Sequence, residues 1–307
     1  MVLSLQHLSL SVPDLKEGAD FYSAFGMNMS EGHSALGFRC DNKPDDEIVL
    51  VESGQKRKFN HISFASDAAG FAAIEGRLKD KNIELLSKPF KDAPDGLWFR
   101  DPDGNLVNVQ EADIAARPAE PVPPVNRPGV IERSAQRGCP KPTIAARPRR
   151  LGHMILFTPS VPRQLQFYTE VLGMQISDTI VEEYGAFLRT AGDSDHHVVG
   201  FLHSNAPGFH HASFEMGSID EAELGAMRLF GKGYKHAWGP GRHAIGSNYF
   251  HYFRDPWNGM AEYFFDIDYI PKDSEWEPAE WTKKDGMFLW SADGPPPPDF
   301  GKNYEAD

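Results

Sequence analysis

Cysteine is scarce in this 307-residue sequence, where only Cys40 and Cys139 occur. Two cysteines cannot supply the disulfide framework of a small secreted domain, so we expect a protein of the reducing cytoplasm. The sequence also lacks a run of about 18 apolar residues, so we expect no transmembrane helix. The opening residues, MVLSLQHLSLSVPDL, lack the basic start and the apolar stretch of a secretory signal peptide.

Positive charge is also in deficit. The chain has 31 lysines and arginines against 44 aspartates and glutamates, which gives a net charge of −13. This balance argues against nucleic acid and anionic membrane surfaces as partners. The phosphate-binding patterns GxGxxG and GxxxxGK[ST] are both absent, so the sequence implies no nucleotide cofactor.

Histidine, by contrast, is concentrated in one part of the chain. Nine of the twelve histidines fall between His153 and His251. Such a cluster indicates a metal site or an acid–base site, although a core that tolerates histidine would also explain it. The length suits two domains of ordinary size, and an apolar content of 40% is typical of a globular protein.

Three pairs of segments recur in the same order along the chain. In the first pair, LQHLSLSV and LGHMILFT each precede a Phe-Tyr dipeptide and then a Gly-Met dipeptide. In the second, FNHISFAS around His61 matches FHHASFEM around His211. In the third, RDPDGNLVNVQ matches RDPWNGMAEYF. Chance would not preserve the order of all three, so the chain is a tandem duplication.

Each copy is predicted to contain a strand, a helix and several further strands. Short apolar runs favour strands, and helical spacing follows a proline-containing start at Leu15–Phe25 and Arg163–Leu172. Each copy then ends in a hairpin built on an Asp-Pro turn. Between the copies, the stretch PVPPVNRPG indicates a linker. The tail after Ile270 carries three tryptophans, so we expect its first half to pack on a domain or to cover a pocket.

The tandem βαβββ modules resemble the vicinal oxygen chelate superfamily, which has the glyoxalase, bleomycin-resistance and dioxygenase fold. The second copy, with the segment GPGRHAIGSNYFHYFRDPWNG, resembles the type I extradiol ring-cleavage dioxygenases of the catechol 2,3-dioxygenase group. The resemblance implies an α+β fold in two domains. It also implies extradiol (meta) cleavage of a catechol-type aromatic by O₂ in aromatic-compound catabolism, and a homo-oligomer, since members usually assemble. The long linker departs from the compact pattern of the family.

Four parts of the chain follow from the repeat and the resemblance. The first copy is expected to be structural and the second to be catalytic and metal-binding. The predicted parts are residues 1–112 (the N-terminal structural module pair), 113–150 (the Pro/Arg-rich linker), 151–270 (the C-terminal catalytic domain) and 271–307 (the tail, a possible pocket cover).

Two imidazoles and one carboxylate on three strands can occupy one face of an octahedron, as in non-haem Fe(II) oxygenases, and leave positions open for substrate and O₂. The second copy places His153, His211 and Glu262 on three predicted strands. By resemblance these residues match the metal ligands of the family, for Fe(II) or for Mn(II). The alternative is three core residues with ordinary hydrogen bonds. His210 competes with His211, but the alignment with His61 favours His211 and leaves His210 behind the site or at the surface.

The equivalents in the first copy are His7, His61 and Asn108. A neutral amide there replaces the carboxylate, so the charge of an ion would be less compensated. We therefore expect the histidines of this copy to be relics or hydrogen-bonded core residues. The resemblance agrees, since two-module members keep metal only in the second module.

Three further residues complete the predicted site. His197, in the segment DHHVV, looks like the acid–base histidine of the family. His196 is its competitor, since strand alternation turns only one of the two inward, and a solvated His-His pair on a loop is the alternative. His243 resembles the histidine that contacts the substrate hydroxyl or the bound oxygen. Tyr252 resembles the tyrosine that hydrogen-bonds the deprotonated hydroxyl.

The DPWNG turn adds a geometric prediction. Tyr252 and Glu262 are equidistant from Trp257 in the sequence. A symmetric hairpin would place them opposite each other, with Cα atoms roughly 5 Å apart. The tyrosine hydroxyl would then lie within reach of a group at the metal.

Three other functions remain open from the sequence. A glyoxalase-like metal-dependent isomerase shares the fold but usually uses more than one carboxylate or amide, and has no use for His197, His243 and Tyr252 together. A 4-hydroxyphenylpyruvate dioxygenase-like enzyme shares the ligand set but has a different tail. A metal-free ligand-binding or resistance protein would trap its ligand between the copies. The many aromatic residues of the second copy favour a small aromatic diol as substrate, whose ring substituents the sequence does not identify.

Overall fold

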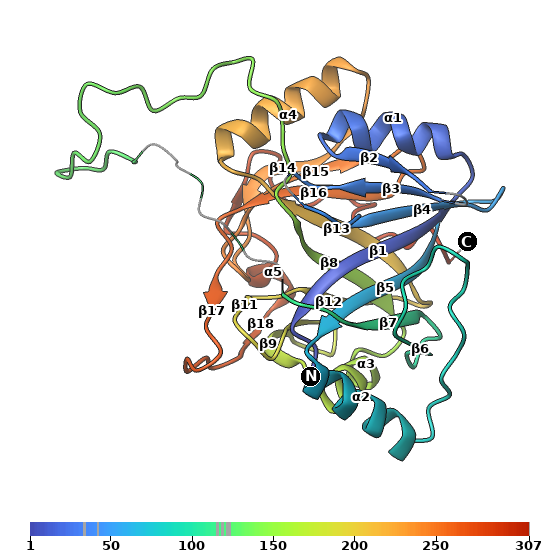
Figure 1. The fold of residues 1–307 in the computed structure, drawn as a ribbon. Helices are drawn as coiled ribbons and strands as arrows, with labels where there is room; N and C mark the ends of the chain where they lie inside the picture. The colour runs from blue at the N-terminus through green and yellow to red at the C-terminus, as the bar shows by residue number, and fades with distance from the viewer. Residues whose placement is uncertain (33–34, 42, 115–116, 118–119, 121–123, 307) are drawn as a thin grey trace.

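The structure, a computed structural model, describes residues 1–32, 35–41, 43–114, 117, 120 and 124–306. A seven-stranded sheet, in the order β2-β3-β4-β1-β5-β7-β6, is formed by the first copy (Figure 1). Two βαβββ modules meet in it at the antiparallel pair β1–β5. The strands are β1 (Ser4–Val12), β2 (Asn28–Glu31), β3 (Leu36–Arg39), β4 (Ile48–Glu52), β5 (Lys58–Ser66), β6 (Leu97–Arg100) and β7 (Leu106–Glu111).

The second copy forms a ten-stranded sheet in the order β18-β9-β10-β12-β8-β13-β16-β15-β14-β19. Its outermost strands, β18 and β19, come from the tail, and β11 pairs separately with β17. The strands are β8 (Leu151–Thr158), β9 (Gln175–Ile180), β10 (Gly185–Arg189), β11 (Ser194–Asp195), β12 (Val199–His203), β13 (Gly208–Glu215), β14 (His236–Arg242), β15 (Tyr249–Arg254), β16 (Met260–Phe265), β17 (Tyr269–Ile270), β18 (Ala279–Trp281) and β19 (Trp290–Ser291).

Four helices lie against the sheets as two pairs, each with one helix from either copy (Figure 1). α1 lies beside α4, and α2 lies near α3, where Lys81 Nζ is 2.6 Å from the Glu170 carboxylate. A fifth, short helix belongs to the tail. Within the described ranges, no helix is both long and apolar enough to cross a bilayer. The helices are α1 (Leu15–Phe25), α2 (Ala68–Asp80), α3 (Val161–Glu170), α4 (Ile219–Gly231) and α5 (Lys283–Gly286).

Helix α1 begins and ends where its sequence predicts. Asp14 caps it by accepting hydrogen bonds from the backbone N–H groups of Lys16 and Glu17. It ends at Gly26, whose φ of +102° is a left-handed conformation that favours glycine. The face between these ends buries Phe21 and Phe25, at the spacing of one helical turn.

Phe25 also joins the two halves of the molecule. Its ring lies 4.2 Å from that of Tyr263 and 5.4 Å from that of Phe214, both on strands of the second sheet. The Tyr263 hydroxyl donates a hydrogen bond to the backbone carbonyl of Phe25. Burying a phenylalanine side chain contributes roughly 1.5–3 kcal/mol. The halves therefore share one hydrophobic core rather than packing as independent bodies.

The predicted α+β fold of tandem modules is confirmed, but two helices are missing from the prediction. The helix at Leu15–Phe25 is correct, and the second predicted helix begins earlier than expected, at Val161. α2 and α4 were not predicted. Both follow ordinary N-cap residues, Asp67 and Ser218, whose side chains accept a backbone hydrogen bond in the first turn.

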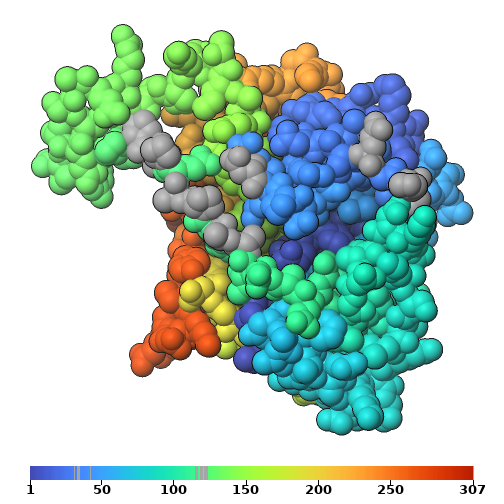
Figure 2. Space-filling view, in the orientation of Figure 1, coloured from blue at the N-terminus to red at the C-terminus, as the bar shows by residue number. Residues whose placement is uncertain are grey.

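The linker and the tail behave differently. Residues 124–145 project from the body as an extended loop (Figures 1 and 2), with an isolated bridge between Arg127 and Val130. The tail instead returns to the second sheet, where β18 pairs with β9 and β19 pairs with β14. The Trp276 indole donates a 2.9 Å hydrogen bond to the Ser177 carbonyl. The boundaries of the four predicted parts stay a prediction.

A buried ion pair attaches the first half to the DPWNG turn. Arg57 Nε lies 2.9 Å from Asp255 Oδ2, with side-chain exposures of 4% and 1%. The other carboxylate oxygen of Asp255 accepts hydrogen bonds from the backbone of Trp257 and Gly259. The pair thus holds the turn that sets the register of β15 and β16.

We expect Arg57→Ala to lower the free energy of unfolding by about 3–5 kcal/mol, because it leaves a carboxylate buried without its partner. Arg39→Ala, which breaks the more exposed pair with Asp46, should lower it by at most about 1 kcal/mol. Urea denaturation of both variants measures the difference. Equal losses would contradict a clamp at the turn.

Candidate active site

Strands β8, β13 and β16 are neighbours in the second sheet, and each carries one predicted metal ligand. Glu262 Oε2 lies 3.3 Å from His153 Nε2 and 3.2 Å from His211 Nε2. One possible ligand atom of each residue lies within 4.8 Å of the other two. Donor atoms that bind one ion at right angles, with bonds of about 2.1 Å, lie roughly 3 Å apart. The spacing therefore fits a single divalent ion.

Glu262 has no exposed surface. Its Oε1 accepts a 3.3 Å hydrogen bond from Asn248, whereas Oε2 has no hydrogen-bond partner among the described residues. Burial raises the pKa of Glu262, but its contacts with His153 and His211 outweigh this effect, so its pKa lies below the ordinary value. An ionised carboxylate is costly to bury without a compensating charge. The carboxylate thus favours a cation at this point.

The neighbour of His211 determines which of its nitrogens is free. His210 Nε2 lies 2.8 Å from the Phe300 carbonyl, which can only accept, so this nitrogen carries the proton. Burial lowers the pKa of His210, and a neutral ring then leaves Nδ1 as an acceptor for the Nδ1–H of His211. His211 Nε2 therefore carries a lone pair that faces Glu262 Oε2. Two lone pairs at 3.2 Å repel each other unless a cation lies between them.

The expectation that His210 might lie at the surface is wrong. It is 2% exposed and lies at a register irregularity in the pairing of β13 with β8, between Phe209 and His211. A bulge interrupts the alternation of faces along a strand, so two successive histidines can both be buried.

The first copy repeats the same frame. His7 is aligned with Ser63 on β5, and Ser63 with Asn108 on β7. His153 is aligned through β13 with Glu262 in the same way. The duplication therefore extends to the register of individual residues, and the two copies differ in the side chain at the carboxylate position.

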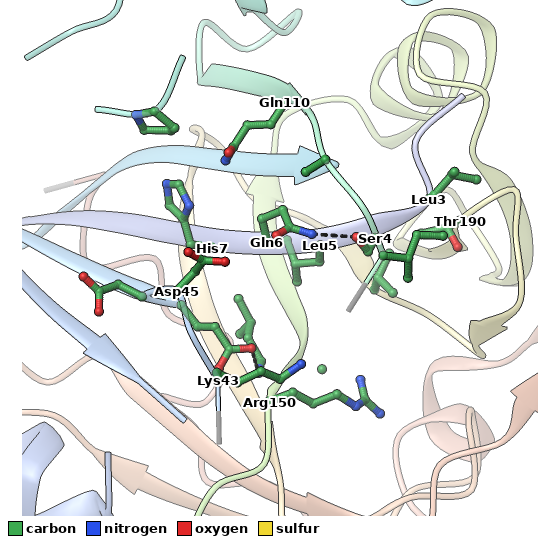
Figure 3. Close-up of a pocket in the computed structure, with 18 of the residues that line it drawn as sticks. Leu3, Ser4, Leu5, Gln6, His7, Lys43, Asp45, Gln110, Arg150 and Thr190 are labelled. Carbon is green, nitrogen blue, oxygen red and sulfur yellow. Dashed lines mark hydrogen bonds between the residues drawn. The ribbon is translucent and has the colours of Figure 1, made fainter. Parts of the chain in front are cut away.

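The histidines of the first copy bond to each other instead. His7 Nε2 and His61 Nε2 are 2.9 Å apart, and burial lowers the pKa of His7 to about 4, so the pair is neutral. Asn108 accepts a 2.6 Å hydrogen bond from Ser63. A cavity of about 750 Å³ lies beside the pair, where Figure 3 shows His7 and Gln110, and it opens as a hollow in Figure 2. These contacts fit the predicted structural role.

Tyr252 stands directly opposite Glu262 in the pairing of β15 with β16, which confirms the predicted hairpin register. Its hydroxyl lies 2.9 Å from His243 Nε2, and His243 Nδ1 faces the Met287 carbonyl. The carbonyl can only accept, so His243 Nε2 is the acceptor for the tyrosine proton. Burial lowers the pKa of His243 to about 4. Burial and then the charge of Glu262 raise the pKa of Tyr252, which stays a phenol.

His197 lies against the ligand cluster, and its neighbour lies behind it. The His197 ring is 4.3 Å from that of His153, whereas His196 packs on the tail residue Trp276. Both histidines are buried, so the alternative of a solvated pair is wrong. They lie between β11 and β12, where strand alternation does not apply. Burial and then the charges of nearby histidines hold the pKa of His197 well below its usual range.

The structure therefore brings all six predicted side chains into one buried cluster, and their individual roles stay predictions. Asn248 was missed, because one amide among many in a loop carries no distinguishing signal. The backbone carbonyls of Met287 and Phe300 were also missed, since any residue could provide them. A groove of about 840 Å³ leads to His243 between the second sheet and the tail. Its tail residues include Trp281, Met287, Phe288, Pro295 and Pro296.

The other polar residues considered from the sequence lie outside the cluster. Arg242 pairs with Asp266 at 3.0 Å, which confirms the structural ion pair expected for it. His203 is exposed, and His251 is buried against Glu223, with 2.7 Å between ring and carboxylate. None of the three contacts the ligand trio in these bonds.

The comparisons with known proteins agree with this geometry. The family model of the glyoxalase/bleomycin resistance protein/dioxygenase superfamily matches residues 4–109 and 150–263. Metapyrocatechase 2 of Cupriavidus necator is 35% identical, over 99% of this chain and 93% of its own length. The chain belongs to the extradiol dioxygenases of this superfamily.

Solved structures support the fold of this dioxygenase. A Mn(II)-bound glyoxalase from Novosphingobium aromaticivorans matches with a TM-score of 0.76 and 23% identity, over 100% of this chain and 99% of its own. The 2,3-dioxygenase LapB from Pseudomonas sp. KL28 matches with a TM-score of 0.75 and 20% identity, over 92% and 98% of the two chains. Both identities are too low to carry more than the fold.

We expect His211→Ala to abolish metal binding at the site, because it removes one of three ligands and its lone pair. His61→Ala is the matched control, since His61 occupies the same strand position in the first copy, and it should retain the metal. Elemental analysis of anaerobically purified protein measures both. Full metal occupancy in His211→Ala would refute the ligand assignment.

Proposed function

We propose that this dioxygenase cleaves a catechol-type diol beside its hydroxyls and incorporates both atoms of O₂. The observation that carries the proposal is the buried trio of His153, His211 and Glu262, in which two lone pairs face each other. His197, His243 and Tyr252 surround the trio with groups able to accept or donate a proton. The 35% identity with a metapyrocatechase over nearly the whole chain supports the same reaction.

The donor set fits a divalent metal, and we propose Fe(II), with Mn(II) as the ion that the same ligands would also hold. His153 and His211 would bind it through nitrogen and Glu262 through Oε2. When bound, the metal supplies a redox-active Lewis acid that favours ionised diol hydroxyls and activates O₂. The buried carboxylate cancels part of its charge.

The surrounding residues are suited to position the diol and move its protons. His197 is buried beside His153 and neutral, so it can accept a proton from a diol hydroxyl and return it later in the reaction. Tyr252 is a phenol whose hydroxyl can turn from His243 to donate to an ionised hydroxyl. Aromatic side chains such as Phe187, whose ring is 5.0 Å from that of His197, provide apolar walls for an aryl ring.

Two further proposals concern the setting of the enzyme. Cys40 and Cys139 are both free thiols, which supports the reducing cytoplasm as its location. Assembly into a homo-oligomer stays a prediction. The site offers one carboxylate among its proposed ligands, which favours the dioxygenase over the glyoxalase-like isomerase that shares the fold.

The proposed reaction is tested with Fe(II)-loaded enzyme and a panel of unsubstituted, 3-substituted and 4-substituted catechols. We expect yellow ring-cleavage products with one O₂ consumed per diol. His197→Phe should keep its metal and lower kcat by about 10²–10⁴-fold, the usual contribution of an acid–base group.

His203→Phe is the control, because His203 is an exposed histidine outside the cluster, and its kcat should equal that of the wild type. No O₂ uptake with any diol by metal-loaded wild type would overturn the proposed function. Unchanged kcat in His197→Phe would assign the proton transfer to another residue.

A further inference from the structure

Three buried side chains form a chain that leads away from His197. Its Nδ1 lies 3.0 Å from Nδ1 of His196, and Nε2 of His196 lies 3.3 Å from Oδ2 of Asp178 on β9. The three residues are 4%, 0% and 3% exposed. The sequence gave His196 only as a competitor for the role of His197, and Asp178 had no role.

The tail holds the far end of this chain. Asp178 Oδ1 accepts a 2.8 Å hydrogen bond from the backbone N–H of Ala279, and Oδ2 accepts a 2.7 Å bond from the indole N–H of Trp281. Burial raises the pKa of Asp178, but its bonds with His196, Ala279 and Trp281 outweigh burial and lower the pKa below its ordinary value. The carboxylate is therefore an anion with a fixed orientation.

The number of available protons determines the direction of the chain. The anionic Asp178 can only accept, so the nitrogen of His196 that faces it, Nε2, carries the proton. A neutral His196 then has a lone pair on Nδ1, and the 3.0 Å contact requires the proton on Nδ1 of His197. The other nitrogen of His197, Nε2, is left with its lone pair at the opposite end of the ring.

We infer that Asp178 is a positioning residue, which acts through His196 to keep His197 in the tautomer whose Nε2 is free to accept a proton. The inference rests on the proposed function, in which His197 accepts a proton from the diol. A carboxylate that orients a catalytic imidazole through its remote nitrogen is a familiar arrangement. Here one more imidazole lies between them, and a C-terminal tryptophan fixes the carboxylate.

Replacement of the carboxylate by an amide tests the inference. Asp178→Asn keeps the size of the side chain but places an N–H group where the chain needs an acceptor. We expect kcat to fall at least about tenfold with KM and metal content unchanged, since an acid–base group contributes about 10²–10⁴-fold in all. In a His197→Phe background the same substitution should have no further effect. Trp281→Phe, which removes only the N–H donor, should lower kcat in the same direction by less.

Asp46→Asn is the matched control, because Asp46 is a hydrogen-bonded, ion-paired carboxylate of the first half, and its kcat should be unchanged. An equal fall in kcat for Asp178→Asn in both the wild-type and the His197→Phe background would assign Asp178 a structural role and overturn the inference. Unchanged kcat in the wild-type background would also overturn it.

A second measurement does not depend on activity. In zinc-loaded protein labelled with ¹⁵N-histidine, we expect the His197 signals, identified by their loss in His197→Phe, to show the proton on Nδ1. Asp178→Asn should move part of that proton to Nε2. A proton on Nε2 of His197 in the wild type would refute the inference. If no diol is cleaved, the proposed function fails, and the NMR result still decides the tautomer.

Discussion

A buried carboxylate without a fixed positive partner constrains the whole second half of this protein. Glu262 is fully enclosed, and the contacts of its carboxylate are imidazoles and an amide. His211 presents a lone pair to it because Phe300 and His210 occupy its other nitrogen. Such an arrangement is stable only with a cation present, so the fold of the domain and the binding of metal are linked.

The first half shows what the same frame does without the carboxylate. Strand order and register are repeated, but an amide stands at the position of Glu262 and bonds to its own strands. The two histidines then satisfy each other at 2.9 Å. A single change of side chain, from Glu262 to Asn108, therefore accompanies the difference between a site that favours a cation and a closed hydrogen-bonded pair. The duplication thus provides an internal control for the assignment of the metal site.

The repeat allowed much of this arrangement to be predicted from the sequence. Matching segments identified the strand positions of the ligands, and the symmetric turn placed Tyr252 opposite Glu262. Strand alternation failed at His196 and His210, because one lies in a loop and the other in a bulge, and neither feature has a periodic signal. The roles of Asp178 and of the tail carbonyls depend on tertiary contacts between segments about a hundred residues apart, which local patterns do not reveal.

The tail connects these parts, since it contributes an edge strand on either side of the sheet and bonds to groups behind three site residues. The central claim is that one cation lies between His153, His211 and Glu262. A crystal structure of anaerobically prepared, Fe(II)-loaded protein, with anomalous data at the iron edge, tests it most directly. We expect one strong peak per chain, within about 2.0–2.2 Å of two imidazole nitrogens and a Glu262 oxygen. An empty trio, or iron at the His7–His61 pair instead, would contradict the account.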